Sequence, residues 1–329
     1  KAIGIPWYNV MGNHDMDYDA SEDRYADDTF ENNFGPANYS FNVGKAHFIV
    51  LDNILYPDPR DNKGYWGGFR EDQLKFIAND LKYVSKDQLI VLAFHIPLQH
   101  HHEDAFKNES RQRLFDLLKD FPHTVSLSAH THLQQQLYYG KEEGWHQEKP
   151  HHEYNVGTTS GDWYSGEKDS NGVPVSTMRD GTPKGYAILK VKGNRYSFDY
   201  KVANQPQAYQ MNIYHTQRIP QGSKSKAMLM VNFFMGRAGD VVEYQLNGGE
   251  WKKMNYSPAV DYHYLKTIMN FDEDALQFQG KRPSDAVTST HMWSVRLPSK
   301  ISGKHHIRVR ATDQYGNVHY GTAEYEVVK

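Results

Sequence analysis

The chain has 329 residues, of which 38% are hydrophobic and 23% charged, a composition typical of folded domains and enough for two cores. A formal net charge of -3 provides no basic field, so no nucleic-acid surface is expected. The absence of cysteine excludes disulfides and thiolate metal sites, which leaves His, Asn, Asp, Glu and backbone oxygen as metal ligands. No apolar run approaches the ~20 residues of a membrane span.

The first part of the chain alternates apolar runs with amphipathic stretches. Two stretches have apolar residues at helical spacing and predict helices, residues 70–84 with Leu74, Ile77 and Leu81, and residues 109–121. The apolar runs predict strands at residues 4–11, 46–53, 87–95 and 123–130. Alternation of strands and helices predicts an α/β layered domain.

The second part of the chain has a different pattern. Residues 140–185 are rich in Gly, Trp, Tyr and His and predict long loops, and residues 185–202 predict a hairpin around Gly193-Asn194. A polar stretch at 217–226 predicts a linker, after which short strands of period two predict a small all-β sandwich. We therefore expect an α/β domain over residues 1–216 and a β-sandwich domain over 217–329.

Polar side chains that can bind metal follow three of the predicted strands. Asn13, His14 and Asp15 follow the first, His95 ends the third, and His130 and His132 end the fourth. A single such histidine is most often just a polar strand terminus. Ligands of open α/β sheets collect beyond the carboxyl ends of strands, so three such ends in order indicate a converging site for Zn, Mn, Fe or Ni.

The motifs "GNHD" (12–15), "VLAFHIP" around His95 and "SAHTH" (128–132) resemble, in order and spacing, motifs of the calcineurin-like metallophosphoesterases. Longer segments such as "SGDWYSG", "MRDGTPKGY" and "VRATDQYGNVHY" are similar to a bacterial branch that carries its own C-terminal β-domain. The resemblance covers essentially the whole chain. It implies a hydrolase of phosphomonoesters or phosphodiesters that acts on a small phosphorylated substrate. Because the branch is often exported, it also implies a periplasmic or otherwise exported location.

The resemblance implies a role for each matching residue. Asn13, His95 and His130 would bind one metal of a pair, and His132 the other. His14 would protonate the leaving oxygen or stabilise transition-state charge, and Asp15 would orient the His14 imidazole. The metals, Mn, Zn or Fe, would hold phosphate oxygens and activate a bridging water.

The sequence departs from the family pattern in two places. Only eleven residues precede Gly12, where the family has an Asp-x-His and a Gly-Asp-x-x-Asp motif. We therefore expect a truncated chain that binds at most about one ion and is weakly active or inactive. Ala129 stands where the family has Gly, a change that is harmless if its φ is negative and costs on the order of 1 kcal/mol if φ is positive.

Further residues are candidates for binding the substrate. Trp163 and Tyr164 could stack on a ring or sugar or pack their loop, and Arg179 could meet an anion or remain a solvated charge. For His151 and His152 a structural or pocket-wall role is favoured over metal ligation. The alternative function is a non-catalytic ligand- or glycan-binding protein that retains a vestigial metal site.

Overall fold

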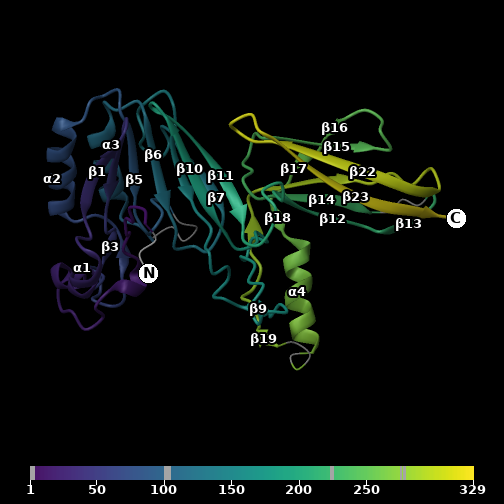
Figure 1. The fold of residues 1–329 in the computed structure, drawn as a ribbon, viewed down its shortest axis with the longest axis horizontal. Helices are drawn as coiled ribbons and strands as arrows, with labels where there is room; N and C mark the ends of the chain where they lie inside the picture. The colour runs from purple at the N-terminus through teal and green to yellow at the C-terminus, as the bar shows by residue number, and fades with distance from the viewer. Residues whose placement is uncertain (1–3, 100–104, 223–225, 275, 277–278) are drawn as a thin grey trace. The chain divides into compact units, whose positions relative to one another are not determined.

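A computed structural model describes residues 4–99, 105–222, 226–274, 276 and 279–329. The chain forms two compact units, which we describe separately (Figure 1). The first comprises Lys1–Thr131, Leu137–Asn155 and Lys190–Tyr196. The second comprises His132–Gln136, Val156–Leu189 and Ser197–Lys329. The chain thus passes from one unit to the other between Thr131 and His132.

A six-stranded sheet, in the order β1-β2-β5-β6-β8-β7, organises the first unit. Its strands are β1 (Tyr39–Val43), β2 (Ala46–Val50), β5 (Leu89–Ala93), β6 (Thr124–Ser128), β7 (Gln135–Tyr139) and β8 (His151–Asn155). β2, β5, β6 and β8 are parallel neighbours, whereas β1 pairs antiparallel with β2. The strands predicted within 46–53, 87–95 and 123–130 are therefore confirmed as β2, β5 and β6, and their carboxyl ends lie at one edge.

Two helices share a hydrophobic core with this sheet. α2 (Glu71–Asp80) buries Leu74 and Ile77, and α3 (Asn108–Leu118) buries Leu114, Phe115 and Leu118. These side chains pack in one cluster with apolar residues of β2 and β5. Both predicted helices are confirmed, since apolar residues at helical spacing face the sheet. The shorter helical elements are α1 (Asp28–Phe34), η1 (Asn13–Asp15), η2 (Asp23–Tyr25) and η3 (Leu81–Tyr83).

The strand predicted at residues 4–11 is wrong. Within the described part of this stretch the backbone joins no strand, and Ile5, Trp7 and Tyr8 are exposed while Met11 is buried. Gly4 has a left-handed φ of 77°, and Pro6 has no N–H to donate to a ladder. The Tyr8 ring instead stacks on Phe41 of β1, with ring centroids 3.8 Å apart. Apolar content here reflects aromatic packing rather than strand pairing.

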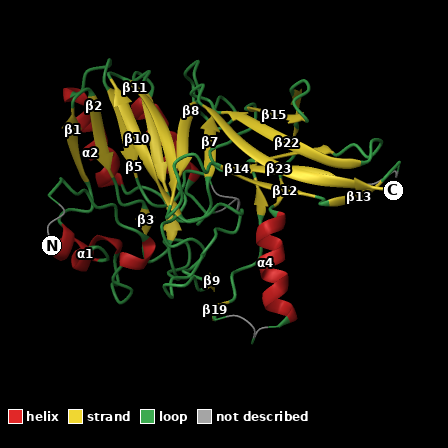
Figure 2. Cartoon of the chain, turned by 45° about the vertical axis from the view of Figure 1, so that its right-hand side comes forward, coloured by secondary structure: helices red, strands yellow, loops and turns green. Residues whose placement is uncertain are grey.

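The connections at the carboxyl end of the sheet are long. β3 (Ile54–Leu55) begins four residues after β2 ends and pairs with β4 (Trp66–Gly67). Figure 2 shows loops of the first unit collected at the end of the sheet where β3 lies. This end carries the candidate site described below.

The second unit is largely β-structure, as predicted. One sheet has the order β12-β14-β21-β17 and the other β13-β23-β22-β15-β16. Burial alternates along β22, where His305, Ile307, Val309 and Ala311 face inward. The strands of these sheets are β12 (Met211–His215), β13 (Arg218–Pro220), β14 (Met228–Phe233), β15 (Val241–Leu246), β16 (Lys252–Lys253), β17 (Asn255–Tyr256), β21 (Met292–Arg296), β22 (Gly303–Thr312) and β23 (Val318–Val328).

Two features of the second part differ from the prediction. α4 (Tyr262–Glu273) was not predicted, although Tyr264, Ile268 and Phe271 give it a buried stripe and Asp261 caps it by accepting from the Tyr264 N–H at 2.9 Å. Within the predicted linker 217–226, β13 pairs in parallel with β23. The three-residue β13 is too short to give a periodic signal, whereas α4, with 12 residues, is as long as the predicted helices and was overlooked among the short strands expected in this part of the chain.

The remaining strands form pairs. The predicted hairpin is confirmed as β10 (Gly185–Lys192) and β11 (Arg195–Val202), with Gly193 at a φ of 65° in the turn. The other short strands are β9 (Gly166–Glu167), β18 (Ala259–Val260), β19 (Gly280–Lys281) and β20 (Thr288–Ser289). None of the helices in the described ranges is long and apolar enough to cross a membrane.

Candidate metal site

Three side chains of the first unit converge beyond the carboxyl ends of β5 and β6. Asn13 begins η1, and His95 and His130 each lie two residues after a parallel strand. The His95 Nε2 lies 2.8 Å from the Asn13 Oδ1, and the His130 Nδ1 lies 3.2 Å from that oxygen. The two ring nitrogens are 3.1 Å apart. We call Asn13, His95 and His130 the strand-end cluster.

The donor atoms of the strand-end cluster fit a divalent ion. Ligand atoms bound to one ion at about 2.1 Å lie about 3 Å apart, which is the size of the triangle formed here. If the His95 Nε2 and the His130 Nδ1 both carried a hydrogen, both could donate to the Asn13 oxygen. The two N–H groups would then face each other at a nitrogen–nitrogen distance of 3.1 Å, which is unfavourable. In the tautomers with lone pairs on these nitrogens, all three atoms are electron-pair donors within 3.2 Å of one another. Among the described residues no group of three or more His, Asp and Glu could hold a metal, and the third donor atom of the strand-end cluster is the Asn13 amide oxygen.

A buried asparagine fixes the backbone that carries His95. Asn53, fully buried after β2, accepts hydrogen bonds from the backbone N–H groups of His95 at 3.1 Å and Ile96 at 2.9 Å. Its Nδ2 donates to the Ile96 carbonyl at 2.6 Å. Sequence reasoning missed Asn53, although it follows an apolar strand just as His95 and His130 do.

Gly12 leaves room for the His95 ring. A Cβ added at Gly12 would lie 3.1 Å from both the Cε1 and the Nδ1 of His95. The same glycine closes the turn of η1, since its N–H donates to the Asp15 Oδ2 at 2.8 Å and its carbonyl accepts from the Asp15 N–H at 2.9 Å. The structure therefore places the Asp15 carboxylate at the turn backbone. His14 is exposed beside it, and the orienting role of Asp15 toward His14 stays a prediction.

The turn after β6 holds histidines in unusual backbone conformations. His130 and His132 have φ values of 64° and 54°, a left-handed region that non-glycine residues rarely adopt and that costs about 1–3 kcal/mol. Ala129 does not share this conformation, so Ala in place of the family's Gly is tolerated. His130 and His132, with Thr131 between them, both have this strained backbone conformation. Surrounding side chains must therefore hold the turn in place.

His132 belongs to the second unit, where its ring contacts Trp163 with centroids 4.6 Å apart. Trp163 and Tyr164 are 53% and 52% exposed, and both have a φ of 52°. The Lys184 ammonium lies 5.4 Å from the Tyr164 ring centroid. Arg179 is half-buried, and its backbone carbonyl accepts from the Val287 N–H at 3.1 Å. Both aromatic residues are exposed with left-handed backbones, and a role in binding the substrate stays a prediction.

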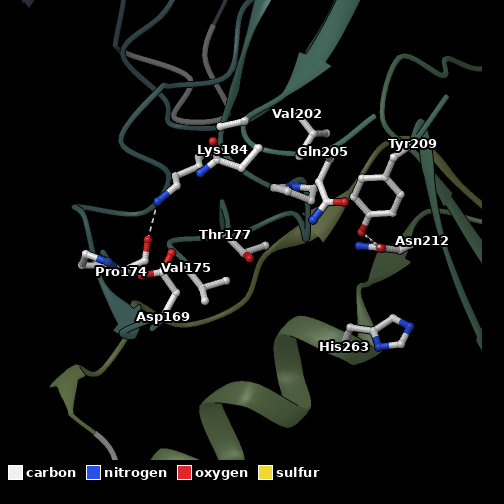
Figure 3. A pocket seen from close by; sticks show the side chains of 13 residues that line it. Asp169, Pro174, Val175, Thr177, Lys184, Val202, Gln205, Tyr209, Asn212 and His263 are labelled. Atoms are coloured by element: carbon white, nitrogen blue, oxygen red, sulfur yellow. Dashed lines mark hydrogen bonds between the residues drawn. The ribbon is translucent and has the colours of Figure 1, made fainter. Parts of the chain in front are cut away.

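The second unit also contains a polar cavity of about 420 Å³ (Figure 3). Two of its polar side chains have partners within the protein. The Lys184 ammonium donates to the Pro174 carbonyl, and the Tyr209 hydroxyl donates to the Asn212 Oδ1. None of the predicted site residues lines the cavity, and it gives no indication of a ligand. The lining residues are Asp169, Pro174, Val175, Thr177, Pro183, Lys184, Val202, Ala203, Asn204, Gln205, Tyr209, Asn212 and His263.

Comparison with known proteins agrees with the fold. The family model for calcineurin-like phosphoesterase matches residues 1–134, and the model for the C terminal of calcineurin-like phosphoesterase matches residues 153–319. The chain belongs to the calcineurin-like phosphoesterase family, whose members are generally metal-dependent hydrolases of phosphoesters.

Other comparisons add little. No curated protein matches the chain. A crystal structure of the sulfane dehydrogenase SoxCD from Paracoccus pantotrophus is 11% identical, with a TM-score of 0.15, over 54% of this chain. This chain covers 34% of that structure's chain, and a likeness so small informs neither fold nor function.

Proposed function

We propose that the protein is a phosphomonoesterase or phosphodiesterase in which Asn13, His95 and His130 hold one divalent ion, Mn, Zn or Fe. The observation that supports this most strongly is the triangle of the Asn13 Oδ1, His95 Nε2 and His130 Nδ1, with sides of 2.8, 3.2 and 3.1 Å. His132, two residues after His130, is the ligand we assign to a second ion. Among the described residues we assign no other ligand to that ion, so we expect about one bound ion per chain and slow turnover.

Different residues of the chain have different roles in the proposed hydrolysis. A bound divalent ion supplies positive charge to phosphate oxygens and lowers the pKa of a coordinated water. Because Asn13 and two neutral imidazoles carry no negative charge, they leave that positive charge available to the substrate. His14, exposed next to Asn13, donates a proton to the leaving oxygen. Asp15 keeps this segment in its turn through the Gly12 N–H.

Trp163 and Tyr164 are the residues we assign to the organic group of the substrate, and Arg179 to an anionic part of it. Exposure of both aromatic rings, and the contact of Trp163 with His132, support this assignment. We expect Trp163→Ala to raise KM for an aryl phosphate several-fold and to leave kcat nearly unchanged. An exported, periplasmic location belongs to the same proposal.

The test is the metal content per chain, by elemental analysis, after incubation with Mn²⁺ or Zn²⁺ and washing. We expect about one ion per chain in the wild type and none in His95→Ala. Hydrolysis of p-nitrophenyl phosphate and bis(p-nitrophenyl) phosphate, measured in parallel, distinguishes a monoesterase from a diesterase. An unchanged ion content in His95→Ala would overturn the assignment, and a wild type without bound ion would favour a non-catalytic ligand-binding protein.

A further inference from the structure

β8 carries a row of polar side chains where a buried strand normally carries apolar ones. All five of its residues are buried, and His151, Glu153 and Asn155 alternate along it on one face. β8 is the parallel neighbour of β6, with Glu153 opposite Ser126 and Asn155 opposite Ser128. Burial of an amide and a carboxyl is costly unless hydrogen bonds compensate, so the partners of these groups are informative.

Asn155 contacts the turn on both sides of His130. Its Nδ2 donates to the Ala129 carbonyl and, at 3.1 Å, to the Ser128 Oγ. Its Oδ1 accepts from the Thr131 hydroxyl. The residue before His130 and the residue after it are thus bound to one amide group. These hydrogen bonds on both sides of His130 stabilise its left-handed backbone and fix the direction of its ring.

Glu153 connects the segments that follow β5 and β6. Its Oε1 accepts from the Ser128 Oγ at 2.5 Å, and both carboxyl oxygens lie 3.3 Å from the N–H of Leu98, three residues after His95. The Tyr139 hydroxyl donates to its Oε2 at 2.9 Å. Burial raises the pKa of Glu153 to about 7, although these hydrogen bonds act in the opposite direction. One side chain therefore links the two strand ends that carry the histidines.

We propose that Asn155 and Glu153 are positioning residues that hold His130 and His95 in the geometry that binds a divalent ion. The inference rests on the proposed function, since it assumes that these histidines are ligands. Residues that orient metal ligands typically change metal affinity by 10- to 100-fold when they are removed. His151, on the same face, provides the contrast, because it bonds to Thr124 at 2.8 Å and Ser126 at 2.6 Å, away from the His130 turn.

The experiment measures Mn²⁺ affinity by calorimetric titration of the full chain, with urea unfolding of each variant in parallel. We expect Asn155→Ala to weaken Mn²⁺ binding by about 10- to 100-fold. Thr131→Val, which keeps the shape and removes one hydrogen bond to Asn155, is expected to weaken it several-fold. The matched control is Thr124→Val, which removes a hydrogen bond between the same two strands and is expected to leave the affinity within about twofold.

A fourth variant, His130→Ala, separates the two claims. If it binds Mn²⁺ like the wild type, the proposed metal site is wrong and the inference falls with it. If it loses binding while Asn155→Ala and Thr131→Val keep wild-type affinity, only the positioning role is wrong. Should Asn155→Ala fail to fold, Thr131→Val decides the question, because wild-type affinity in that variant also contradicts the inference.

Discussion

Two clusters of polar side chains in this protein both contain histidine and asparagine, but they differ in how their polar atoms are arranged. The strand-end cluster, in the first unit, brings three lone-pair atoms within 3.2 Å of one another. The buried cluster, in the second unit, sets each nitrogen of its histidine ring against an oxygen atom. It consists of Asp180, Asn232, Asp261 and His291.

The hydrogen bonds of the buried cluster show the contrast directly. The His291 Nδ1 lies 2.6 Å from the Asn232 Oδ1, and its Nε2 lies 3.3 Å from the Asp180 Oδ2. The Asn232 Nδ2 donates to the Asp261 Oδ2 at 2.8 Å. Burial alone would raise the pKa of Asp180, but hydrogen bonds that include the one to His291 hold it below its usual value. All four residues are at most 2% exposed. Ring nitrogens that face oxygen atoms in a fully buried setting suit a structural role, whereas the two ring nitrogens that face each other at half-buried strand ends fit the proposed cation site.

The largest expected effect comes from matched histidine substitutions in the two clusters. His130→Ala removes one of three ligand atoms, and we expect it to lower Mn²⁺ affinity by more than about 100-fold. His291→Ala removes an imidazole whose two nitrogens face oxygen atoms of Asn232 and Asp180 rather than another ring nitrogen, and we expect unchanged affinity. Calorimetric titration of both variants checks the comparison. Equal loss of affinity in the two would erase the distinction drawn between the clusters.

Stability is expected to respond in the opposite order. His291→Ala leaves the buried Asp180 carboxylate without one of its partners, which costs about 3 kcal/mol in the free energy of unfolding. His130→Ala, at a half-buried position with a strained backbone, is expected to cost less than about 1 kcal/mol. Urea unfolding of both variants measures the difference. A His130→Ala variant as unstable as His291→Ala would assign the strand-end cluster a structural role.

The Glu153 carboxyl predicts a dependence of stability on pH. Its pKa is raised to about 7 in the folded protein, so the folded state binds a proton more tightly than the unfolded state. Its effect is therefore to destabilise the fold as pH rises from about 4.5 to 7. Relative to wild type, Glu153→Gln should gain up to about 3 kcal/mol in unfolding free energy between pH 4.5 and pH 8. Parallel pH profiles for the two proteins would exclude this proton linkage.

A smaller effect is expected at Gly12. Gly12→Ala places a Cβ 3.1 Å from two atoms of the His95 ring, so the ring must move by a few tenths of an ångström. We expect a several-fold loss of Mn²⁺ affinity with little change in stability. Gly12 has an extended backbone with a φ of -119°, so its control is Gly140→Ala, where φ is not left-handed and the added Cβ would meet only the Glu143 Oε2 at 3.6 Å; this variant should leave the affinity unchanged. Wild-type affinity in Gly12→Ala would show that the ring position is not critical.

The sequence predicted the sheet and helices of the first unit because β2, β5, β6, α2 and α3 each have a regular apolar period. The side chains that brace the site were not predictable in the same way. Asn155 and Glu153 act through the pairing of β8 with β6, and β7 precedes β8 in sequence but lies beyond it in the sheet. Strand order across a sheet is set by tertiary packing, which local periodicity does not encode.

The stretch before the site shows the opposite error. Residues 4–11 have the apolar content of a strand, yet Trp7 and Tyr8 are exposed and the described backbone there joins no ladder. A strand requires a partner, and composition alone does not provide one. The polar residues at the strand ends, by contrast, could be recognised in the sequence, because each directly follows an apolar run.

The most direct test of the central claim is pulsed electron paramagnetic resonance of Mn²⁺ bound to the full chain. The technique detects couplings to imidazole nitrogens coordinated to the ion. The account predicts couplings from two histidines in the wild type, and from one histidine in whatever fraction of His95→Ala or His130→Ala still binds Mn²⁺ at high concentration. Bound Mn²⁺ without any imidazole coupling would place the ion elsewhere and contradict the assignment of Asn13, His95 and His130 as its ligands.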